Sequence, residues 1–179
     1  MEFEEIIRKR TAVRKFSERR LEKEKLDKIL EAGRLAPTAK NNQPFKIYVV
    51  NSEDGLVKID NASRCRYGAK TVLIVCGNKE EAYHKGDYST YEMDSCIVAT
   101  HMMLEATNIG VDNIWIESFD ENILKEEFNI PKDYIPICLL PLGYKTDDCP
   151  INLLHERRKN IENIVEYKWL FNIYLINKW

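Results

Sequence analysis

The residues best suited to bind a charged ligand lie near the N-terminus, in the stretch Arg8–Phe16 (RKRTAVRKF). Five cations fall within its first eight residues. Guanidinium groups and backbone N–H groups bind phosphate well, because charge-assisted hydrogen bonds are the strong ones. The stretch therefore indicates a phosphate site. The alternative is a solvated basic helix end, which the helix dipole favours.

A second polar stretch, Ala36–Phe45 (APTAKNNQPF), follows a predicted helix and precedes a predicted strand. It is dense in turn formers and side-chain amides. Such a loop can present hydrogen-bond donors and acceptors to the edge of a flat heteroaromatic ring. The alternative is an ordinary helix-to-strand connection with an Asx turn.

Three later stretches, Asn108–Phe119, Leu139–Tyr144 and Arg157–Lys159, are further candidates for a binding site. The last leads into a helical pattern formed by Ile161, Ile164 and Val165. Each stretch is equally compatible with a core strand or a surface helix. The histidines and cysteines form no Ser-His-Asp, Cys-His or metal-ligand pattern, so we expect no metal and assign no catalytic side chain.

Helices must position these stretches. Apolar residues recur at helical spacing in Phe3–Lys9 and in Leu21–Leu35, and Pro37 follows the second of these. Glu92–Ile109 predicts a long buried helix that ends at Gly110, which is typical of a C-cap. A further helix begins after Asp120, a good N-cap residue, and contains Ile123, Leu124 and Phe128.

The predicted strands are Lys46–Val50, Thr71–Cys76, Ile114–Ile116 and Tyr134–Leu142. The second is continuously apolar, which favours a central position. Pro136 and Pro141 indicate an edge strand or a bend in the last one. The irregular order of helices and strands predicts an α+β domain with three layers, without fixing its topology.

Composition limits the class of protein. A length of 179 residues fits one domain, and a net charge of −2 with a pI near 6.0 argues against nucleic acid as a partner. Five scattered cysteines and a start of Met1 followed by Glu2 suggest no signal peptide and a reducing cytoplasmic location. No apolar run reaches the ~20 residues needed to cross a bilayer, so we expect no membrane-spanning helix.

The order of the motifs resembles the nitroreductase family of flavin mononucleotide (FMN) enzymes. Arg10–Phe16 matches its (R)-x-(S/T)-x-(R/K)-x-F pattern, and Ala36–Phe45 matches A-P-S-x-x-N-x-Q-P-W. Asp94–Ala106 is similar to the long helix D-x-x-I-A-x-x-x-M-x-L-A-A. The family's G-L-x-x-x-W-I-G-x-F, P-L-G-Y and R-K-x-L-E-E-I-V motifs correspond to 110–119, 141–144 and 158–165. The resemblance covers residues 2 to 169.

The resemblance implies a three-layer α/β/α fold around a mixed, mainly antiparallel sheet, in a homodimer that binds FMN. Arg10 and Arg158 would contact the phosphate, and Arg14 would lie near the pyrimidine edge. Residues 37–41 would line the ring or ribityl chain, largely from the other subunit, and the backbone of 116–118 would face flavin N5. The full implied set is Arg10, Thr11, Ala12, Arg14, Pro37, Thr38, Ala39, Asn41, Ile116, Glu117, Ser118 and Arg158.

Several residues depart from the family pattern. Ala12 stands where the family has a phosphate-binding serine, which removes one hydroxyl worth roughly 0.5–1.5 kcal/mol. Phe45 replaces the tryptophan after Q-P, and Glu117 replaces the glycine after W-I. The flavin contact expected from 61–66 has no assigned residue.

The implied activity is transfer of hydride from NADH or NADPH through FMN to an organic acceptor such as a nitroaromatic or a quinone. Alternatives are a flavin store or sensor without turnover, a dehalogenase-like reductase, and a structural dimer with a decayed site. We expect 1–169 to form the FMN-binding domain and 170–179 to be an apolar extension that packs on its own or the partner subunit. Contact with a membrane surface is the alternative for this extension. Residues 77–92 are candidates for the cover over the flavin. The sequence names neither the acceptor nor the preferred nicotinamide.

Overall fold

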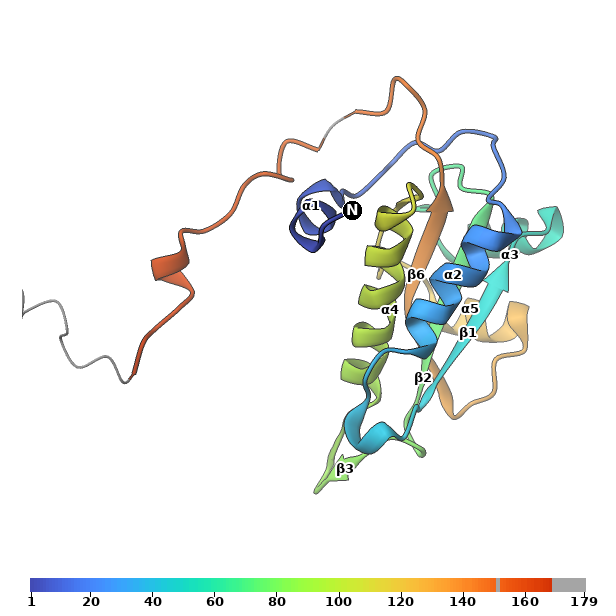
Figure 1. The fold of residues 1–179 in the computed structure, drawn as a ribbon. Helices are drawn as coiled ribbons and strands as arrows, with labels where there is room; N and C mark the ends of the chain where they lie inside the picture. Colours follow the sequence, from blue (N-terminus) through green and yellow to red (C-terminus); the bar gives the residue numbers. More distant parts are fainter. Residues whose placement is uncertain (151, 169–179) are drawn as a thin grey trace, which may run out of the picture.

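The central sheet has the order β1-β2-β6-β5, and each neighbouring pair is antiparallel. The computed structural model (Figure 1) describes residues 1–150 and 152–168, so the tail expected at 170–179 lies outside the described residues. The strands are β1 (Phe45–Val50), β2 (Thr71–Asn78), β5 (Asp112–Asn113) and β6 (Tyr134–Gly143). An isolated parallel bridge joins Ala12 to Asn113 beside β5. The sheet is therefore mixed and mainly antiparallel, as expected.

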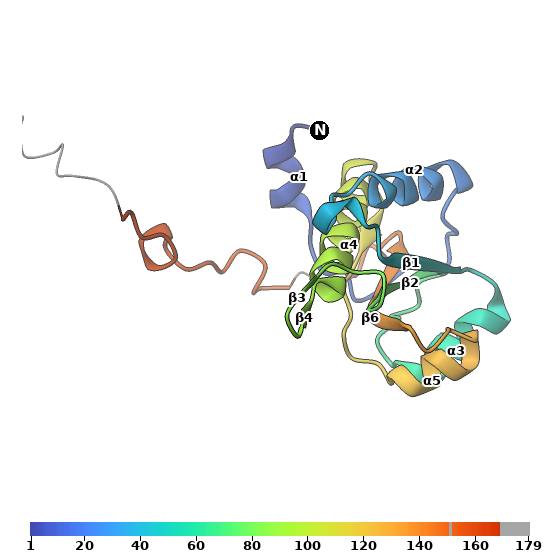
Figure 2. The same cartoon turned by 90° about the horizontal axis from the view of Figure 1, so that it is seen from below.

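Helices cover both faces of the sheet (Figure 2). On one face lie α2 (Lys23–Arg34) and α4 (Tyr91–Asn108), and on the other α3 (Glu53–Ala62) and α5 (Glu121–Phe128). Because side chains alternate along a strand, β2 divides its residues between two cores. Leu73 and Val75 pack with the α2/α4 layer, and Val72 and Ile74 with the α3/α5 layer. The α+β, three-layer prediction is confirmed.

The long helix α4 packs in the core on the α2 side of the sheet. Its residues Val98, Ala99 and Met102 are fully buried. The helix ends where Gly110 adopts φ 73°, a left-handed conformation that glycine tolerates, so the predicted C-cap is confirmed. The N-cap of α5 is confirmed too, since the Asp120 carboxylate accepts hydrogen bonds from the N–H groups of residues 122 and 123.

Strand β6 is not an edge strand, which corrects one alternative raised by its prolines. It lies between β2 and β5, and its register with β2 shifts between Val75 and Cys76, close to Pro136. The prediction of a strand at Ile114–Ile116 was wrong, because β5 ends at Asn113. Ile114 donates to the carbonyl of Pro141, but Pro141 has no N–H to donate in return, so the ladder is interrupted there.

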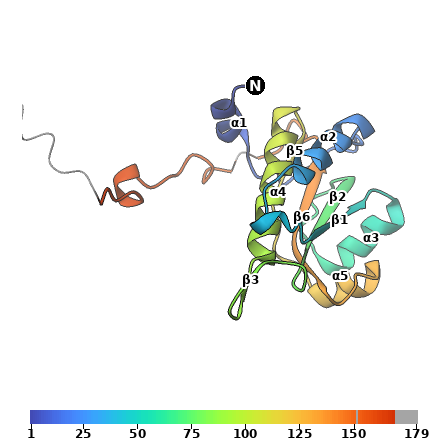
Figure 3. The same ribbon diagram turned by 60° about the horizontal axis from the view of Figure 1, so that its bottom comes forward.

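Residues 1–9 and 152–168 lie outside this layered body (Figures 1 and 3). Helix α1 (Phe3–Lys9) matches its predicted bounds and carries a capping box between Glu2 and Glu5. The helical pattern around 161–165 gives only a 3₁₀ turn, η2 (Ile161–Asn163). Ile161 and Ile164 are 59% and 64% exposed, so this turn lacks the apolar packing that stabilises short helices.

Two elements were not predicted. Helix α3 begins after Ser52, whose hydroxyl accepts a hydrogen bond from the N–H of Gly55 at 3.2 Å. A short hairpin of β3 (His84–Lys85) and β4 (Tyr88–Ser89) occupies the segment suggested as a flavin cover. In the described part of the chain, no helix is long and apolar enough to cross a membrane.

Candidate functional site

Arg10 and Arg158 lie near each other although they come from opposite ends of the described chain. Burial of the Arg10 guanidinium lowers its pKa, and the charge of Arg158 lowers that pKa further. The ring Nε2 of His155 lies 2.9 Å from the carbonyl oxygen of Arg8, which holds the C-terminal segment beside α1. A hollow of about 1030 Å³ between these two segments is lined in part by Ile7 and Arg158.

The N-terminal stretch then runs alongside β5. Ala12 forms the parallel bridge with Asn113, and the N–H of Val13 donates to the Asn113 carbonyl at 3.1 Å. Val13 is buried, and alternate side chains of an extended chain point to opposite faces, so Ala12 and Arg14 point away from the Val13 side chain. Thr11 lines a separate hollow of about 220 Å³.

Arg14 lies beside Tyr67, in the loop between α3 and β2. The N–H of Phe16 donates to the Tyr67 carbonyl at 3.0 Å, which aligns this loop with the basic stretch. Hydrogen bonding to the Cys65 thiol and burial raise the pKa of the Tyr67 hydroxyl, while Arg14 opposes that shift. The same loop reaches the third candidate stretch, because the Ser63 hydroxyl donates to the carbonyl of Ser118 at 2.7 Å.

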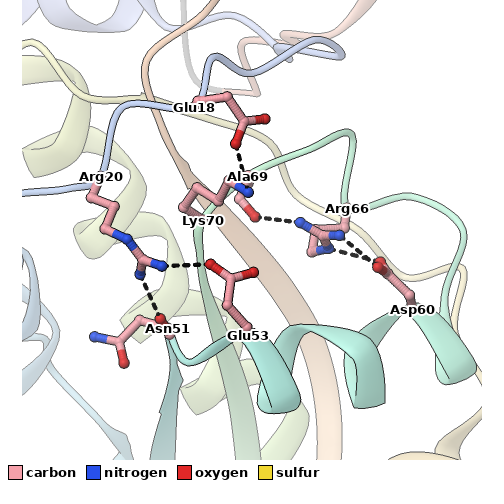
Figure 4. Close-up of polar contacts among 8 residues, drawn as sticks. All are labelled: Glu18, Arg20, Asn51, Glu53, Asp60, Arg66, Ala69 and Lys70. Carbon is pink, nitrogen blue, oxygen red and sulfur yellow. Dashed lines mark hydrogen bonds and ion pairs between the residues drawn. The ribbon is translucent and has the colours of Figure 1, made fainter.

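Ion pairs hold this loop in place (Figure 4). Arg66 makes two hydrogen bonds to the carboxylate of Asp60, at 2.7 and 2.5 Å, and a third to the carbonyl of Ala69 at 2.8 Å. Lys70 pairs with Glu18 at 2.7 Å and so ties the base of the loop to the N-terminal stretch. A planar guanidinium that forks onto one carboxylate fixes orientation as well as distance. Residues 63–67 are therefore held from two sides.

Residues 116–118 lie where the chain leaves the sheet. Ile116 and Leu139 exchange both backbone hydrogen bonds, at 3.0 and 2.9 Å. The next two residues, Glu117 and Ser118, are exposed, and the carboxylate of Glu117 accepts from the indole N–H of Trp115 at 2.8 Å. The backbone around these residues thus emerges from the sheet beside Arg14 and its loop.

The second polar stretch forms a 3₁₀ turn, η1 (Ala39–Asn41), between α2 and β1. Lys40, Asn41 and Gln43 all have positive φ values, of 52°, 56° and 54°. The Thr38 hydroxyl accepts from the N–H of Gln43 at 3.0 Å, and the N–H of Ala39 donates to a carboxylate oxygen of Asp94 at 2.8 Å. The turn-forming character of this stretch is confirmed.

Within one chain, the structure does not bring all the predicted site residues together. Residues 10–14 cross one end of the sheet, while the segment 37–41 lies towards the other end, near β3 (Figure 1). The basic stretch contacts Asn113 of β5, and the loop beside Arg14 contacts Ser118 through Ser63. Arg158 lies near Arg10. Among residues 1–150 and 152–168, no cluster of three potential metal ligands occurs.

Sequence reasoning missed Ser63, Tyr67 and Asp94. Tyr67 has a φ of 54° and precedes Gly68, a pair typical of a turn, but nothing in the sequence places that turn beside Arg14. Asp94 stands in the first turn of a predicted helix, where an acidic residue needs no further explanation.

The fold and the order of the motifs agree with a comparison against protein families. The profile described as the Nitroreductase family matches residues 7–67 and 66–144, and the chain belongs to that family. A nitroreductase family protein from Clostridium difficile 630 is 35% identical in a structural comparison that covers 95% of this chain and 100% of that chain, with a TM-score of 0.88.

Two further relatives bear on the fold and the activity. A structure from Exiguobacterium sibiricum 255-15, solved in complex with FMN, is 22% identical, covers 94% of this chain and 98% of that chain, and has a TM-score of 0.82. It shows the shared fold. A protein from Archaeoglobus fulgidus named "Putative NADH dehydrogenase/NAD(P)H nitroreductase" is 26% identical over 171 residues, which are 92% of this chain and 97% of that protein.

Proposed function

We propose that the protein is an FMN-dependent oxidoreductase that takes hydride from NADH or NADPH and passes electrons to an organic acceptor such as a nitroaromatic or a quinone. The observation that carries this proposal is the approach of Arg158 to Arg10 beside the basic stretch. Membership of the Nitroreductase family, the name of the Archaeoglobus relative and the FMN complex of the Exiguobacterium protein support it.

The chemistry of the donors fits a phosphate. Two neighbouring guanidiniums repel each other, and a half-buried one loses solvation, as the lowered pKa of Arg10 reflects. In the described residues neither Arg10 nor Arg158 pairs with a carboxylate. A dianionic phosphate between them would reverse both penalties, because opposite charge favours the charged form of each arginine. Thr11 and the backbone at Ala12 would complete the phosphate end.

The other end of the site suits the isoalloxazine ring. Bound FMN would accept hydride from the nicotinamide and pass electrons on to the acceptor. The protein would supply orientation and electrostatics. Arg14 would lie at the pyrimidine edge, where a fixed cation stabilises negative charge. The emerging backbone at Ile116, Glu117 and Ser118 would face N5. No side chain needs to act as a nucleophile.

A second copy of the chain completes the site in this proposal. Pro37, Thr38, Ala39 and Asn41 lie far from Arg10 within one chain, so they would line the flavin of the partner. Apolar side chains on α4 and on the C-terminal segment support a homodimer, since Met93 is 51% exposed and Leu153 is 90% exposed. We assign 1–169 to the FMN-binding domain; the extension predicted at 170–179 lies outside the described residues. Five free cysteines support a cytoplasmic location.

The colour of the purified protein tests the cofactor. We expect a yellow protein with flavin absorbance that bleaches when NADH or NADPH is added without oxygen and recovers when a quinone or nitroaromatic follows. Absorbance that does not bleach would make the protein a flavin store or sensor. A colourless protein that does not bind added FMN would contradict the proposal. Bleaching with recovery only by a halogenated acceptor would indicate the dehalogenase-like alternative.

A further inference from the structure

Asp94 is a buried acidic residue to which the proposed chemistry gives no role. It lies in the first turn of α4 and is 1% exposed. One carboxylate oxygen accepts a hydrogen bond from the backbone N–H of Ala39, and the other accepts from the hydroxyl of Thr90, both at 2.8 Å. In residues 1–150 and 152–168 no cation pairs with it. A buried carboxylate held only by such donors makes strong bonds to both of them.

The first donor belongs to a backbone that needs external support. Ala39 begins η1, and three residues close behind it, Lys40, Asn41 and Gln43, have positive φ values without being glycine. Residues of this kind adopt the left-handed region only where the surrounding structure fixes them. The hydrogen bond from the Ala39 N–H to Asp94 anchors the start of this turn to helix α4.

The second donor belongs to the hairpin of β3 and β4. Thr90 closes this hairpin through a backbone hydrogen bond from its N–H to the carbonyl of Tyr83 at 3.0 Å. Two more contacts join the hairpin to the turn: Asn42 donates to the carbonyl of Glu81 at 3.0 Å, and the Lys40 ammonium lies 4.4 Å from the centre of the Tyr83 ring. Figure 3 shows β3 beside the chain that leads into β1.

We propose that Asp94 is a positioning residue that fixes the 37–43 turn and the β3–β4 hairpin as one unit against the isoalloxazine ring. This inference rests on the proposed function, which makes residues 37–41 the wall of the flavin site. In the proposed site this turn lines the ring of the partner subunit's flavin, while Arg10 and Arg158 bind the phosphate, so Asp94 acts on binding of the ring and not on binding of the phosphate. Loss of Asp94 therefore weakens FMN and riboflavin by the same factor.

The test compares Asp94→Leu with Ser95→Ala. Leucine keeps the branched outline of the side chain, with larger methyl groups in place of the oxygens, and removes both acceptors. Ser95 is the next residue on the same helix, is fully buried, and its hydroxyl has no partner in the described residues, so it is a matched control. Hydrogen exchange of the Ala39 amide is measured in the flavin-free protein, and dissociation constants are measured for FMN and riboflavin. We expect Asp94→Leu to raise the exchange rate and both dissociation constants roughly 10- to 150-fold, as loss of a charged hydrogen bond implies.

Exchange at Ala39 tests the role of Asp94, and flavin affinity tests whether the turn lines the ring. Unchanged exchange at Ala39 in Asp94→Leu would overturn the inference whatever the flavin does. Faster exchange with unchanged riboflavin affinity would show that the turn does not line the ring, which overturns that part of the proposed function. An equal effect of Ser95→Ala would reduce Asp94 to general core packing and would also overturn the inference.

A second variant guards against misfolding of Asp94→Leu. Asp94→Asn keeps the size of the side chain and one acceptor oxygen but replaces a charge-assisted bond with a neutral one of about half the strength. We expect Ala39 exchange and both dissociation constants to rise by about fivefold, less than in the leucine variant. Wild-type exchange and affinity in Asp94→Asn, together with wild-type stability, would contradict a role for the charge.

Discussion

The guanidinium of Arg158 adds to burial in lowering the pKa of Arg10, so two arginines from opposite ends of the chain share one neighbourhood. Like charges stay close only where the fold imposes the contact or a ligand offsets the repulsion. Here His155 and the carbonyl of Arg8 hold the two segments together, and the nearby Ala12 provides no hydroxyl. The pair therefore carries most of the charge available for a phosphate in the proposed site.

Removal of either arginine should weaken binding of FMN without affecting riboflavin, which lacks the phosphate. Each charged hydrogen bond contributes on the order of 1.5–3 kcal/mol, so Arg10→Ala and Arg158→Ala should each weaken FMN roughly 10- to 150-fold. Fluorescence titration of both flavins measures this. The double variant should lose nearly all preference for FMN, and added salt should erode the wild-type affinity.

Arg157→Ala is the matched control for these variants, because Arg157 is an exposed neighbour of Arg158. We expect Arg157→Ala to change the affinity for FMN only slightly, because it removes one exposed charge and no contact with the phosphate. Equal weakening of riboflavin and FMN by Arg10→Ala or Arg158→Ala would mean that the arginine is structural and that the phosphate lies elsewhere.

The cysteines should differ sharply in reactivity. Burial raises the pKa of Cys76 to about 12 and that of Cys138 well above the ordinary value of 9.0, and neither thiol is accessible. Since the thiolate is the reactive form, both should resist alkylation near pH 8. Mass spectrometry after brief treatment with N-ethylmaleimide should find Cys149 and Cys65 modified first. Cys76 and Cys138 should react only in denaturant; modification of either in the folded protein would show that this core opens.

Much of the fold could be predicted from local pattern. Helix α1 has the predicted bounds, and α4 was displaced by one residue at each end. The failures have physical causes that act across the sheet. The position of β6 in the interior of the sheet depends on which strands pair. The end of β5 depends on Pro141, whose missing N–H interrupts the ladder only when the two segments lie side by side.

The candidate site was predictable where a motif lies on one continuous stretch. The resemblance to the family assigned Arg10 and Arg158 to one phosphate although they lie far apart in the sequence. In the structure the charge of Arg158 lowers the pKa of Arg10, and the shared phosphate stays a prediction. Ser63 and Tyr67 could not be found in that way, because their contacts with Ser118 and Phe16 cross between loops. The role inferred for Asp94 likewise depends on a turn 55 positions earlier in the chain.

Glu22 should titrate at unusually low pH. A hydrogen bond from the Tyr144 hydroxyl, followed by one from Arg19, lowers the pKa of Glu22 from 4.5 to about 2. Because the pKa in the folded state lies below the ordinary value, the stabilisation is present above about 4.5 and is lost as the pH falls towards 2. Tyr144→Phe should raise the pKa of Glu22, as followed by NMR of its carboxyl carbon.

The control for this titration is Arg19→Gln, which removes the smaller cause and should raise the pKa of Glu22 less. The difference in unfolding free energy between wild type and Tyr144→Phe should shrink as the pH falls through this window. A Glu22 pKa that stays near 2 in Tyr144→Phe would contradict the assigned cause.

Gly33 allows α2 to approach α4 closely, and its substitution should destabilise the protein. A Cβ atom at this position would lie 2.8 Å from Cγ and 2.9 Å from Sδ of Met102, whose side chain is fully buried. Alanine favours a helix over glycine by about 1 kcal/mol, but overpacking a core costs roughly 1–3 kcal/mol. Urea unfolding of Gly33→Ala should therefore show a net loss of about 1 kcal/mol.

A double-mutant cycle with Met102→Ala identifies the cause of that loss. Met102→Ala alone leaves a cavity and should cost about 2–5 kcal/mol. In the Gly33→Ala background the same change also removes the clash. The double variant should therefore lose less unfolding free energy than the sum of the two single losses. Strictly additive losses would mean that Met102 does not limit the approach of the two helices, and a more stable Gly33→Ala would mean that the helix preference of alanine outweighs the contact.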